Sequence, residues 1–252
     1  MKPRTALITG ATAGIGMETA KILSENQFKL IITGRRQERL EELKKKLEHE
    51  NCQVQTLCFD VRSKIEVNHA LSSLTDDWKK IDILINNAGL AAGLAPIDQA
   101  AIDDWEMMID TNIKGLLYMT REVSRWMIEQ KQGHIINISS VAGIEAYPNG
   151  SVYCGTKHAV NAISKAMRIE LAPYNIKVGT VSPGAIETEF SLVRFKGDKE
   201  KAAKVYEGFT PLNARDIAES IYFVLTRPAH VNIDDLLIMP TAQASARDVF
   251  RK

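Results

Sequence analysis

The feature that most constrains the fold is a regular alternation of short apolar segments with amphipathic ones. Apolar segments rich in β-branched residues predict strands at 5–10, 29–35, 53–61, 81–89, 133–140, 176–184 and 235–240. Helical spacing of apolar residues predicts helices at 14–27, 37–50, 64–75, 102–130, 152–173 and 214–227. The strand segments are almost continuously apolar, which is typical of strands covered on both faces. The sequence therefore predicts an α/β fold, with one doubly wound domain over residues 1–252 around a central parallel sheet.

The composition excludes several classes of protein. The net charge of +1 comes from 32 basic and 31 acidic residues, which argues against nucleic acid or an anionic membrane as a partner. No apolar stretch approaches the roughly 20 residues of a membrane span. A strand begins almost at once, which predicts no signal peptide, and three cysteines without CxxC spacing suit a cytoplasmic protein. His134 and His158 lack metal-ligand spacing, so no metal site is predicted.

A glycine-rich segment, "TGATAGIG", lies where the first strand turns into the first helix. Residues without a Cβ let the backbone approach a pyrophosphate, and a helix N-terminus offers free N–H groups and a partial positive charge. The spacing is G-x-x-x-G-x-G and differs from the best-known dinucleotide fingerprint, and glycine-rich turns also occur in other α/β proteins. The predicted cofactor contacts from this loop are Gly10, Thr12, Ala13, Gly14, Ile15 and Gly16.

The end of the second strand predicts which dinucleotide binds. An acidic residue there would accept hydrogen bonds from the ribose of NAD, but this chain has "TGRR". Arg35 and Arg36 can pair with a 2′-phosphate, and Arg35 is nearer the strand end. The alternative is that both arginines begin an exposed charged helix. The sequence predicts NADP(H).

Two later strand ends supply further predicted contacts. Asp60 is expected to take the adenine amino group, with Val61 presenting its backbone, unless Asp60 merely ends the strand. In "NNAG", residues Asn87, Ala88 and Gly89 are expected to line the ligand crevice. For the neighbouring Asn86 two roles are equally favoured, namely lining the crevice and holding the loop together.

Tyr153 and Lys157 form the most informative pair in the chain. They lie four residues apart on one face of a predicted helix. A nearby ammonium favours phenolate and lowers the pKa of a tyrosine, so Tyr153 is predicted as the general acid and base. Ser140 precedes it by 13 residues at a strand end and is predicted to polarise the substrate oxygen. Ser139 is the alternative.

Taken in order, "TGATAGIG", "NNAG", Asn112 in "DTNIKG", "INISS" and Y-x-x-x-K resemble the short-chain dehydrogenase/reductase family over nearly the full length. The resemblance implies a Rossmann-type fold and assigns the catalytic hydroxyl to Ser140. It implies that Lys157 also holds the nicotinamide ribose and that Asn112 supports a water relay. It implies a homotetramer formed through the helices at 102–130 and 152–173. From "SPGAIETEF" it implies further cofactor contacts at Pro183, Gly184, Ile186 and Thr188.

Other segments, among them "EFSLVRFKGD" and "PAHVNIDDLLIMP", resemble the NADP-dependent 3-hydroxy acid dehydrogenases, which oxidise serine and allo-threonine and reduce malonic semialdehyde. The irregular polar segment 187–210 corresponds to the substrate lid. Arg194 in this segment is predicted to pair with a substrate carboxylate, with Lys196 as a weaker candidate and lid anchoring as the alternative role of Arg194. Two other functions remain open: reduction of a different ketone such as a 3-oxoacyl thioester, and NADP binding without catalysis.

Overall fold

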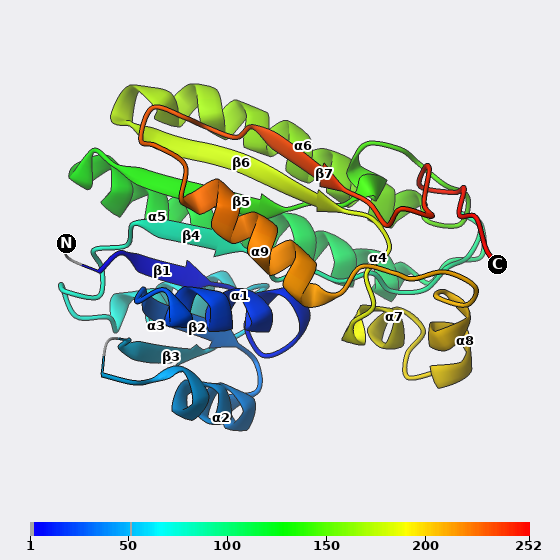
Figure 1. Ribbon diagram of the computed structural model, residues 1–252, viewed down its shortest axis with the longest axis horizontal. Helices are drawn as coiled ribbons and strands as arrows, with labels where there is room; N and C mark the ends of the chain where they lie inside the picture. The colour runs from blue at the N-terminus through cyan, green and yellow to red at the C-terminus, as the bar shows by residue number, and fades with distance from the viewer. Residues whose placement is uncertain (1–2, 51) are drawn as a thin grey trace.

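A seven-stranded parallel sheet forms the centre of the computed structural model, which describes residues 3–50 and 52–252 (Figure 1). Its strand order is β3-β2-β1-β4-β5-β6-β7, and every neighbouring pair is parallel. The strands are β1 (Thr5–Ile8), β2 (Lys29–Gly34), β3 (Val54–Cys58), β4 (Ile83–Asn86), β5 (Gly133–Ile138), β6 (Ile176–Pro183) and β7 (Asp235–Ile238). The predicted α/β class and the parallel sheet are confirmed. The absence of a signal peptide was predicted from the segment "MKPRTALITG", and the first two residues of this segment lie outside the described residues.

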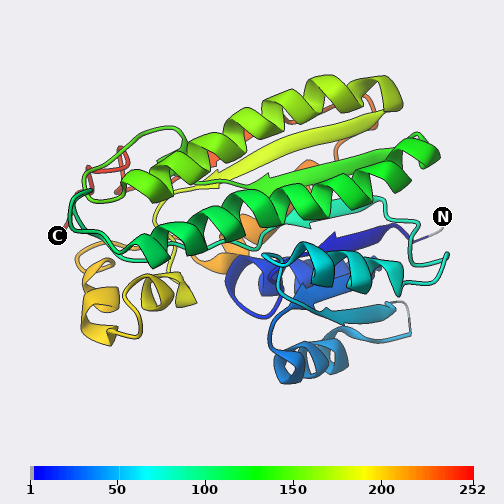
Figure 2. The same ribbon diagram turned by 180° about the vertical axis from the view of Figure 1, so that it is seen from behind.

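Helices cover both faces of the sheet. One face carries α1 (Gly14–Glu25), α2 (Gln37–Leu47) and α9 (Ala214–Leu225) (Figure 1). The other carries α3 (Lys64–Ser72), α5 (Leu116–Gln130) and α6 (Ser151–Leu171), of which α5 and α6 run side by side (Figure 2). This arrangement explains the continuous apolar strands, since helices cover both faces of the central strands, while the edge strand β7 leaves Asp235 and Leu237 exposed.

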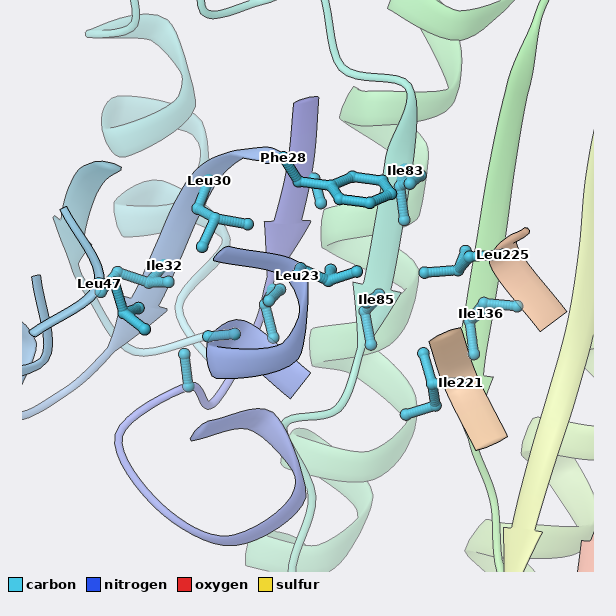
Figure 3. Packing of buried hydrophobic residues seen from close by; sticks show 14 of the residues in the cluster. Leu23, Phe28, Leu30, Ile32, Leu47, Ile83, Ile85, Ile136, Ile221 and Leu225 are labelled. Carbon is cyan, nitrogen blue, oxygen red and sulfur yellow. The ribbon is translucent and has the colours of Figure 1, made fainter. Parts of the chain in front are cut away.

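The core beneath α1 and α9 shows how the strands are buried. Figure 3 shows Ile32 of β2, Ile85 of β4 and Ile136 of β5 packed in one cluster with Leu23 of α1 and Ile221 of α9. All five side chains are fully buried. Burying an aliphatic side chain of this size contributes about 1.5–3 kcal/mol, so these layers fix the strand ends that hold the site.

The predicted helix 102–130 is interrupted. It consists of α4 (Ile102–Ile109), a π-helical turn (Asp110–Gly115) and α5. The π turn contains Asn112, whose amide oxygen accepts a hydrogen bond from the Leu90 amide at 2.9 Å and whose amide nitrogen donates to the Leu90 carbonyl at 2.8 Å. Apolar periodicity continues across the turn, so the sequence pattern could not reveal the interruption, which brings a buried polar residue to the loop after β4.

The segment 187–210 was predicted to be irregular, and this was wrong. It contains two short helices, α7 (Glu189–Arg194) and α8 (Lys199–Lys204). Side chains cap both helices, since the Thr188 hydroxyl accepts from the Phe190 amide and the Asp198 carboxylate accepts from the Lys201 amide. Helices this short lack the repeated apolar spacing that a sequence pattern needs.

The helices α7 and α8 lie at the carboxyl ends of the strands, close to the C-terminal tail (Figure 1). The tail bonds to the same region, because the Lys252 amide donates to the Gly208 carbonyl at 2.8 Å. None of the helices within the described residues combines the length and apolar character that crossing a membrane requires.

Candidate active site

A cleft of about 680 Å³ opens at the carboxyl ends of the strands. It lies where the chain has wound outward from β1 through β2 and β3 and then returns to β4 on the other side of β1. Such a reversal leaves a crevice between the loops that follow the two central strands. Every predicted cofactor contact except Gly16 lines this cleft, as do Ser140, Tyr153, Lys157 and Arg194.

The glycines of the first loop serve different purposes. Gly10 and Gly14 have left-handed φ angles of +66° and +52°, which favour glycine. Gly16 packs against the chain itself, because a Cβ there would lie 2.5 Å from the Asn87 amide nitrogen and 2.6 Å from the Gly10 carbonyl oxygen. Gly16 was predicted as a cofactor contact. The structure gives another reason for a glycine at this position, namely close packing of the loop against the residues that follow β4.

Helix α1 begins at Gly14 without a capping side chain. Its N-cap is Ala13, and its first turn contains no acidic residue among the residues described. The first N–H groups of a helix have no partner within the helix and favour an anion. The helix N-terminus therefore faces the cleft with its N–H groups available to a pyrophosphate.

Asn87 and Thr9 hold the loops after β1 and β4 together. The Asn87 amide nitrogen donates to the Thr9 carbonyl at 2.8 Å and to the Gly10 carbonyl at 3.1 Å. The Thr9 hydroxyl accepts from the backbone amides of Asn87 and Ala88 at 3.0 and 2.9 Å. Asn86 instead donates to Thr120 and Asn137 inside the protein. The two asparagines of "NNAG" thus differ, and only Asn87 lines the cleft.

Arg35 and Arg36 lie at the far end of the cleft, after β2. Arg36 donates to the Thr12 hydroxyl at 2.9 Å and pairs with Glu189 at 3.2 Å. Arg39 of α2 pairs with the same carboxylate at 2.9 Å. Arg36 therefore connects the glycine-rich loop with the first residue of α7, which sequence analysis did not anticipate.

Asp60 lines the cleft, but its carboxylate already has protein partners. Arg62 donates to it at 2.6–3.1 Å, and Arg35 lies 3.7 Å away. Burial of this carboxyl opposes ionisation, yet the hydrogen bonds from Arg62 lower the pKa of Asp60 below its usual value. Val61 is buried and packs against Gly115 of the π turn.

The two serines after β5 point to different neighbours. The Ser140 hydroxyl accepts from the Ala142 amide at 3.1 Å and interacts with the Tyr153 hydroxyl. The Ser139 hydroxyl instead donates to the Lys157 carbonyl at 3.3 Å. This geometry favours Ser140, the predicted residue, as the hydroxyl that shares a substrate oxygen with Tyr153.

Lys157 is buried one helical turn after Tyr153. Its ammonium donates to the Ile138 carbonyl at 2.9 Å and lies 5.9 Å from the centre of the Tyr153 ring. A Cβ added at Gly89 would lie 3.4 Å from Lys157 Nζ and 3.3 Å from Asn112 Oδ1. Asn112 also donates to the Thr156 hydroxyl at 3.1 Å. The predicted set of Asn112, Ser140, Tyr153 and Lys157 therefore lies together.

Burial changes the ionisation of this pair in a way that the sequence did not indicate. Burial raises the pKa of Tyr153 well above the usual value of a phenol, with a hydrogen bond to Ser140 and the charge of Arg194 acting in the opposite direction. Burial lowers the pKa of Lys157 to about 8. A lowered pKa was predicted for Tyr153, but desolvation dominates and raises it, while the Lys157 ammonium donates to the Ile138 carbonyl. Tyr153 is thus held protonated, as a proton donor requires.

Arg194 projects from α7 over the tyrosine. Its guanidinium lies 5.6 Å from the ring centres of both Tyr153 and Tyr147 and donates to the Tyr147 hydroxyl at 2.9 Å. Lys196, the weaker candidate, pairs with the buried Asp104 at 2.9 Å.

The loop after β6 completes the cleft wall. Gly184 donates to the Ile238 carbonyl at 2.7 Å, and a Cβ there would lie 2.5 Å from Gln243 of the C-terminal tail. The Ile186 carbonyl accepts from the Tyr206 hydroxyl at 2.7 Å, and Thr188 lies beside Gly14. Pro183 ends β6.

Several residues at this site had not been predicted. They are Thr9, Tyr147, Thr156, Glu189 and Phe190, the last with its ring 5.7 Å from that of Tyr153. Thr156 lies one residue before Lys157 and was within reach of the same spacing argument. Tyr147 and Glu189 carry no local signal, because their partners are 47 and 153 residues away in the sequence.

Comparison with known proteins gives consistent results. Residues 4–198 match the family model described as short chain dehydrogenase. The NADP-dependent 3-hydroxy acid dehydrogenase YdfG of Salmonella typhi is 49% identical over 241 residues, which cover 95% of this chain and 96% of that protein. The serine 3-dehydrogenase of Agrobacterium fabrum is 43% identical over 242 residues, which cover 96% of each chain.

A solved structure described as the closed form of serine dehydrogenase complexed with NADP⁺ superimposes with a TM-score of 0.92. It is 46% identical, and the match covers 98% of this chain and all of the other. With its parallel sheet, its cleft and a family match over residues 4–198, the chain belongs to the short-chain dehydrogenase family.

Proposed function

We propose that the protein is an NADP-dependent 3-hydroxy acid dehydrogenase. It transfers a hydride between NADP(H) and the C3 carbon of a small 3-hydroxy or 3-oxo acid of the serine, allo-threonine or malonic semialdehyde type. One observation supports this most directly. A single cleft holds the Ser140–Tyr153 hydroxyl pair beneath Arg194 at one end and the guanidinium groups of Arg35 and Arg36 at the other.

The described residues fit a dinucleotide with a 2′-phosphate. The uncapped start of α1, next to the left-handed Gly10 and Gly14, suits a pyrophosphate. Arg35 and Arg36 suit a second phosphate, since guanidinium groups bind phosphate oxygens in a bidentate manner. When bound, NADP supplies the hydride acceptor for oxidation or, in its reduced form, the donor for reduction.

The side chains around the substrate oxygen manage the proton. In reduction, the Ser140 hydroxyl polarises the carbonyl oxygen and Tyr153 donates its proton to the oxygen as negative charge develops there. In oxidation, the Tyr153 oxygen takes the hydroxyl proton of the substrate. For this step Tyr153 starts as the phenolate, which the Lys157 ammonium on the same helix face stabilises, and the proton taken from the substrate returns it to the phenol. Asn112 holds the loop after β4 against α6 through Leu90 and Thr156.

The substrate carboxylate is assigned to Arg194. Its guanidinium lies over the ring of the proposed proton donor, so one small molecule can reach both. A charge-assisted pair of this kind is about twice as strong as a neutral hydrogen bond, which favours acids over uncharged alcohols.

The test is to follow absorbance of the reduced cofactor when purified protein is mixed with NADP⁺ and L-serine at alkaline pH. We expect turnover with NADP⁺ and much less with NAD⁺. Tyr153→Phe should lower kcat at least 100-fold, because general acid–base catalysis contributes roughly 10²–10⁴-fold, while cofactor binding measured by fluorescence stays within about threefold.

Controls with NAD⁺, D-serine and malonic semialdehyde define the substrate. Absence of turnover with both serine and malonic semialdehyde would contradict the 3-hydroxy acid assignment. The assignment to the short-chain dehydrogenase family would be unaffected. Full activity of Tyr153→Phe would contradict the proposed role of the tyrosine.

We also propose that the protein is a cytoplasmic homotetramer without a nucleic-acid or membrane partner. The outward faces of α5 and α6 support this, because Leu117 and Ile169 are 39% and 78% exposed in the isolated chain. Cys52, Cys58 and Cys154 are free thiols, which suits a reducing compartment.

A further inference from the structure

Arg194 is held in one orientation by three contacts. Its Nε donates to the Gly93 carbonyl at 3.3 Å, and one terminal nitrogen donates to the Tyr147 hydroxyl at 2.9 Å. The Gly93 amide donates in turn to the Arg194 carbonyl at 2.9 Å. A guanidinium has five N–H groups, so three of them remain for a ligand, including both on the second terminal nitrogen.

Gly93, whose carbonyl accepts the hydrogen bond from Arg194, has a constrained backbone. Gly93 has a left-handed φ of +69°, and a Cβ there would lie 2.9 Å from an oxygen of the buried Asp104. Asp104 pairs with Lys196, two residues after Arg194, at 2.9 Å. The end of α7 is therefore attached to the loop after β4 at Gly93 and to α4 at Asp104, which limits the positions open to the guanidinium.

The charge of Arg194 has no acidic partner. Within residues 3–50 and 52–252, no carboxylate lies within ion-pair distance of it, whereas Lys196 and Arg36 are both paired. Tyr147 is half-buried and uncharged at neutral pH, because burial raises its pKa. A cation over a partly buried site favours an anionic ligand, and the remaining N–H groups suit the two oxygens of a carboxylate.

The distance between this cation and the reacting oxygen limits the ligand. The guanidinium carbon lies 5.6 Å from the centre of the Tyr153 ring, and the Tyr153 hydroxyl interacts with Ser140. A molecule with its hydroxyl at Tyr153 and its carboxylate at Arg194 must therefore be short. A substrate with a longer chain between these groups has to bend or displace the guanidinium.

We propose that Tyr147 is a positioning residue that fixes the Arg194 guanidinium over Tyr153, so that the enzyme selects acids with one carbon between the carbinol carbon and the carboxylate. This inference rests on the proposed function and specifies how its substrates are distinguished. Tyr147 acts through Arg194 and takes no proton from the substrate.

The experiment compares Tyr147→Phe with the unchanged protein on 2-, 3- and 4-hydroxybutanoate and on methyl 3-hydroxybutanoate, with NADP⁺. The unchanged protein should show its lowest KM with the 3-hydroxy acid. In Tyr147→Phe this KM should rise about 10- to 100-fold, because a hydrogen bond to a charged group contributes about 1.5–3 kcal/mol and tenfold corresponds to 1.4 kcal/mol. The values of kcat and the KM for the ester should stay within about threefold.

A matched control removes a different tyrosine hydroxyl. Tyr222 donates to Asn26 on the surface at 2.8 Å, so Tyr222→Phe should leave every KM unchanged. Equal increases in KM for acid and ester in Tyr147→Phe would show that Tyr147 only attaches α7, which overturns the inference. Unchanged selectivity would overturn it as well.

A binding measurement separates this inference from the proposed function. Malonate has one carbon between two carboxylates, and its affinity for the protein loaded with NADPH can be measured by calorimetry without turnover. If no hydroxy acid is oxidised but malonate binds and Tyr147→Phe weakens this binding at least tenfold, the function fails and the positioning role stands. If malonate does not bind to the unchanged protein, the inference is overturned.

Discussion

At the scale of single residues, burial decides the chemistry more than sequence neighbours do. Tyr153 and Lys157 were recognised by their spacing, yet burial moves their pKa values in opposite directions, upward for the phenol and downward for the ammonium. A protonated tyrosine next to a lysine of lowered pKa is prepared to give a proton to a carbonyl oxygen. The burial of these two residues therefore determines which proton transfer the cleft can perform on a substrate.

His134 of β5 permits a test of burial away from the cleft. It is 1% exposed, and neither ring nitrogen has a hydrogen-bond partner among the described residues. Burial, helped by the charges of Lys177 and Arg4, lowers its pKa from 6.5 to about 3. Below pH 6.5 only the unfolded chain takes up the proton, so the free energy of unfolding should fall by about 1.4 kcal/mol per pH unit towards pH 3.

The measurement is urea denaturation of the protein and of His134→Leu between pH 7 and pH 4. The variant should lose this part of the pH dependence and be at least as stable at pH 7, since it no longer buries two unpaired nitrogens. His230 is exposed, and His230→Gln should behave like the unchanged protein. Identical pH profiles for His134→Leu and the unchanged protein would contradict the assignment.

At the scale of elements, the π turn between α4 and α5 positions the site. Through Asn112 it satisfies both backbone groups of Leu90 in the loop after β4 and reaches Thr156 of α6. Three elements therefore depend on one buried amide. Groups of this kind are costly to leave unpaired, so the turn should contribute to stability as well as to the shape of the cleft.

Asn112→Leu tests this contribution. Loss of the amide leaves two buried backbone groups of Leu90 unpaired, and the free energy of unfolding should fall by about 2–6 kcal/mol, at roughly 1–3 kcal/mol per group. Gln130 on α5 is a control with partly buried amide contacts to Trp126 and Ile81, and Gln130→Leu should cost less than about 1 kcal/mol. Chemical denaturation measures both, and equal losses would contradict a special role for the turn.

At the scale of the whole molecule, the outer surface of α6 is open in the single chain (Figure 2). Gly155 is exposed there, and a Cβ at this position would meet nothing within 4 Å. In the proposed tetramer this bare stretch of helix allows a neighbouring subunit to approach closely. The same surface in a monomer would tolerate a larger side chain without consequence.

Gly155→Leu should therefore dissociate the tetramer while the fold stays intact. Light scattering after size-exclusion chromatography would report the mass, and circular dichroism would report the fold. We expect a tetramer for the unchanged protein and a dimer or monomer for the variant. A monomeric unchanged protein, or a variant that remains tetrameric, would contradict this part of the proposal.

The sequence by itself determined the features that depend on local order. Continuous apolar segments predicted seven parallel strands, since only strands covered on both faces need them. The Tyr153–Lys157 spacing predicted a shared helix face, and the glycines predicted the turn into α1, because each of these follows from residues within a few positions of one another. The boundaries of most helices agree with the structure to within about two or three residues, the uncertainty usual for helix ends.

Only the tertiary structure decided the features that join distant residues. The pairing of Arg36 with Glu189 spans 153 positions, and that of Arg194 with Tyr147 spans 47. The pKa of Tyr153 depends on how completely several elements exclude water from it, which no local pattern records. The π turn preserves the apolar periodicity of an ordinary helix. Contacts and desolvation are properties of the packed chain, so they become visible only when the elements are in place.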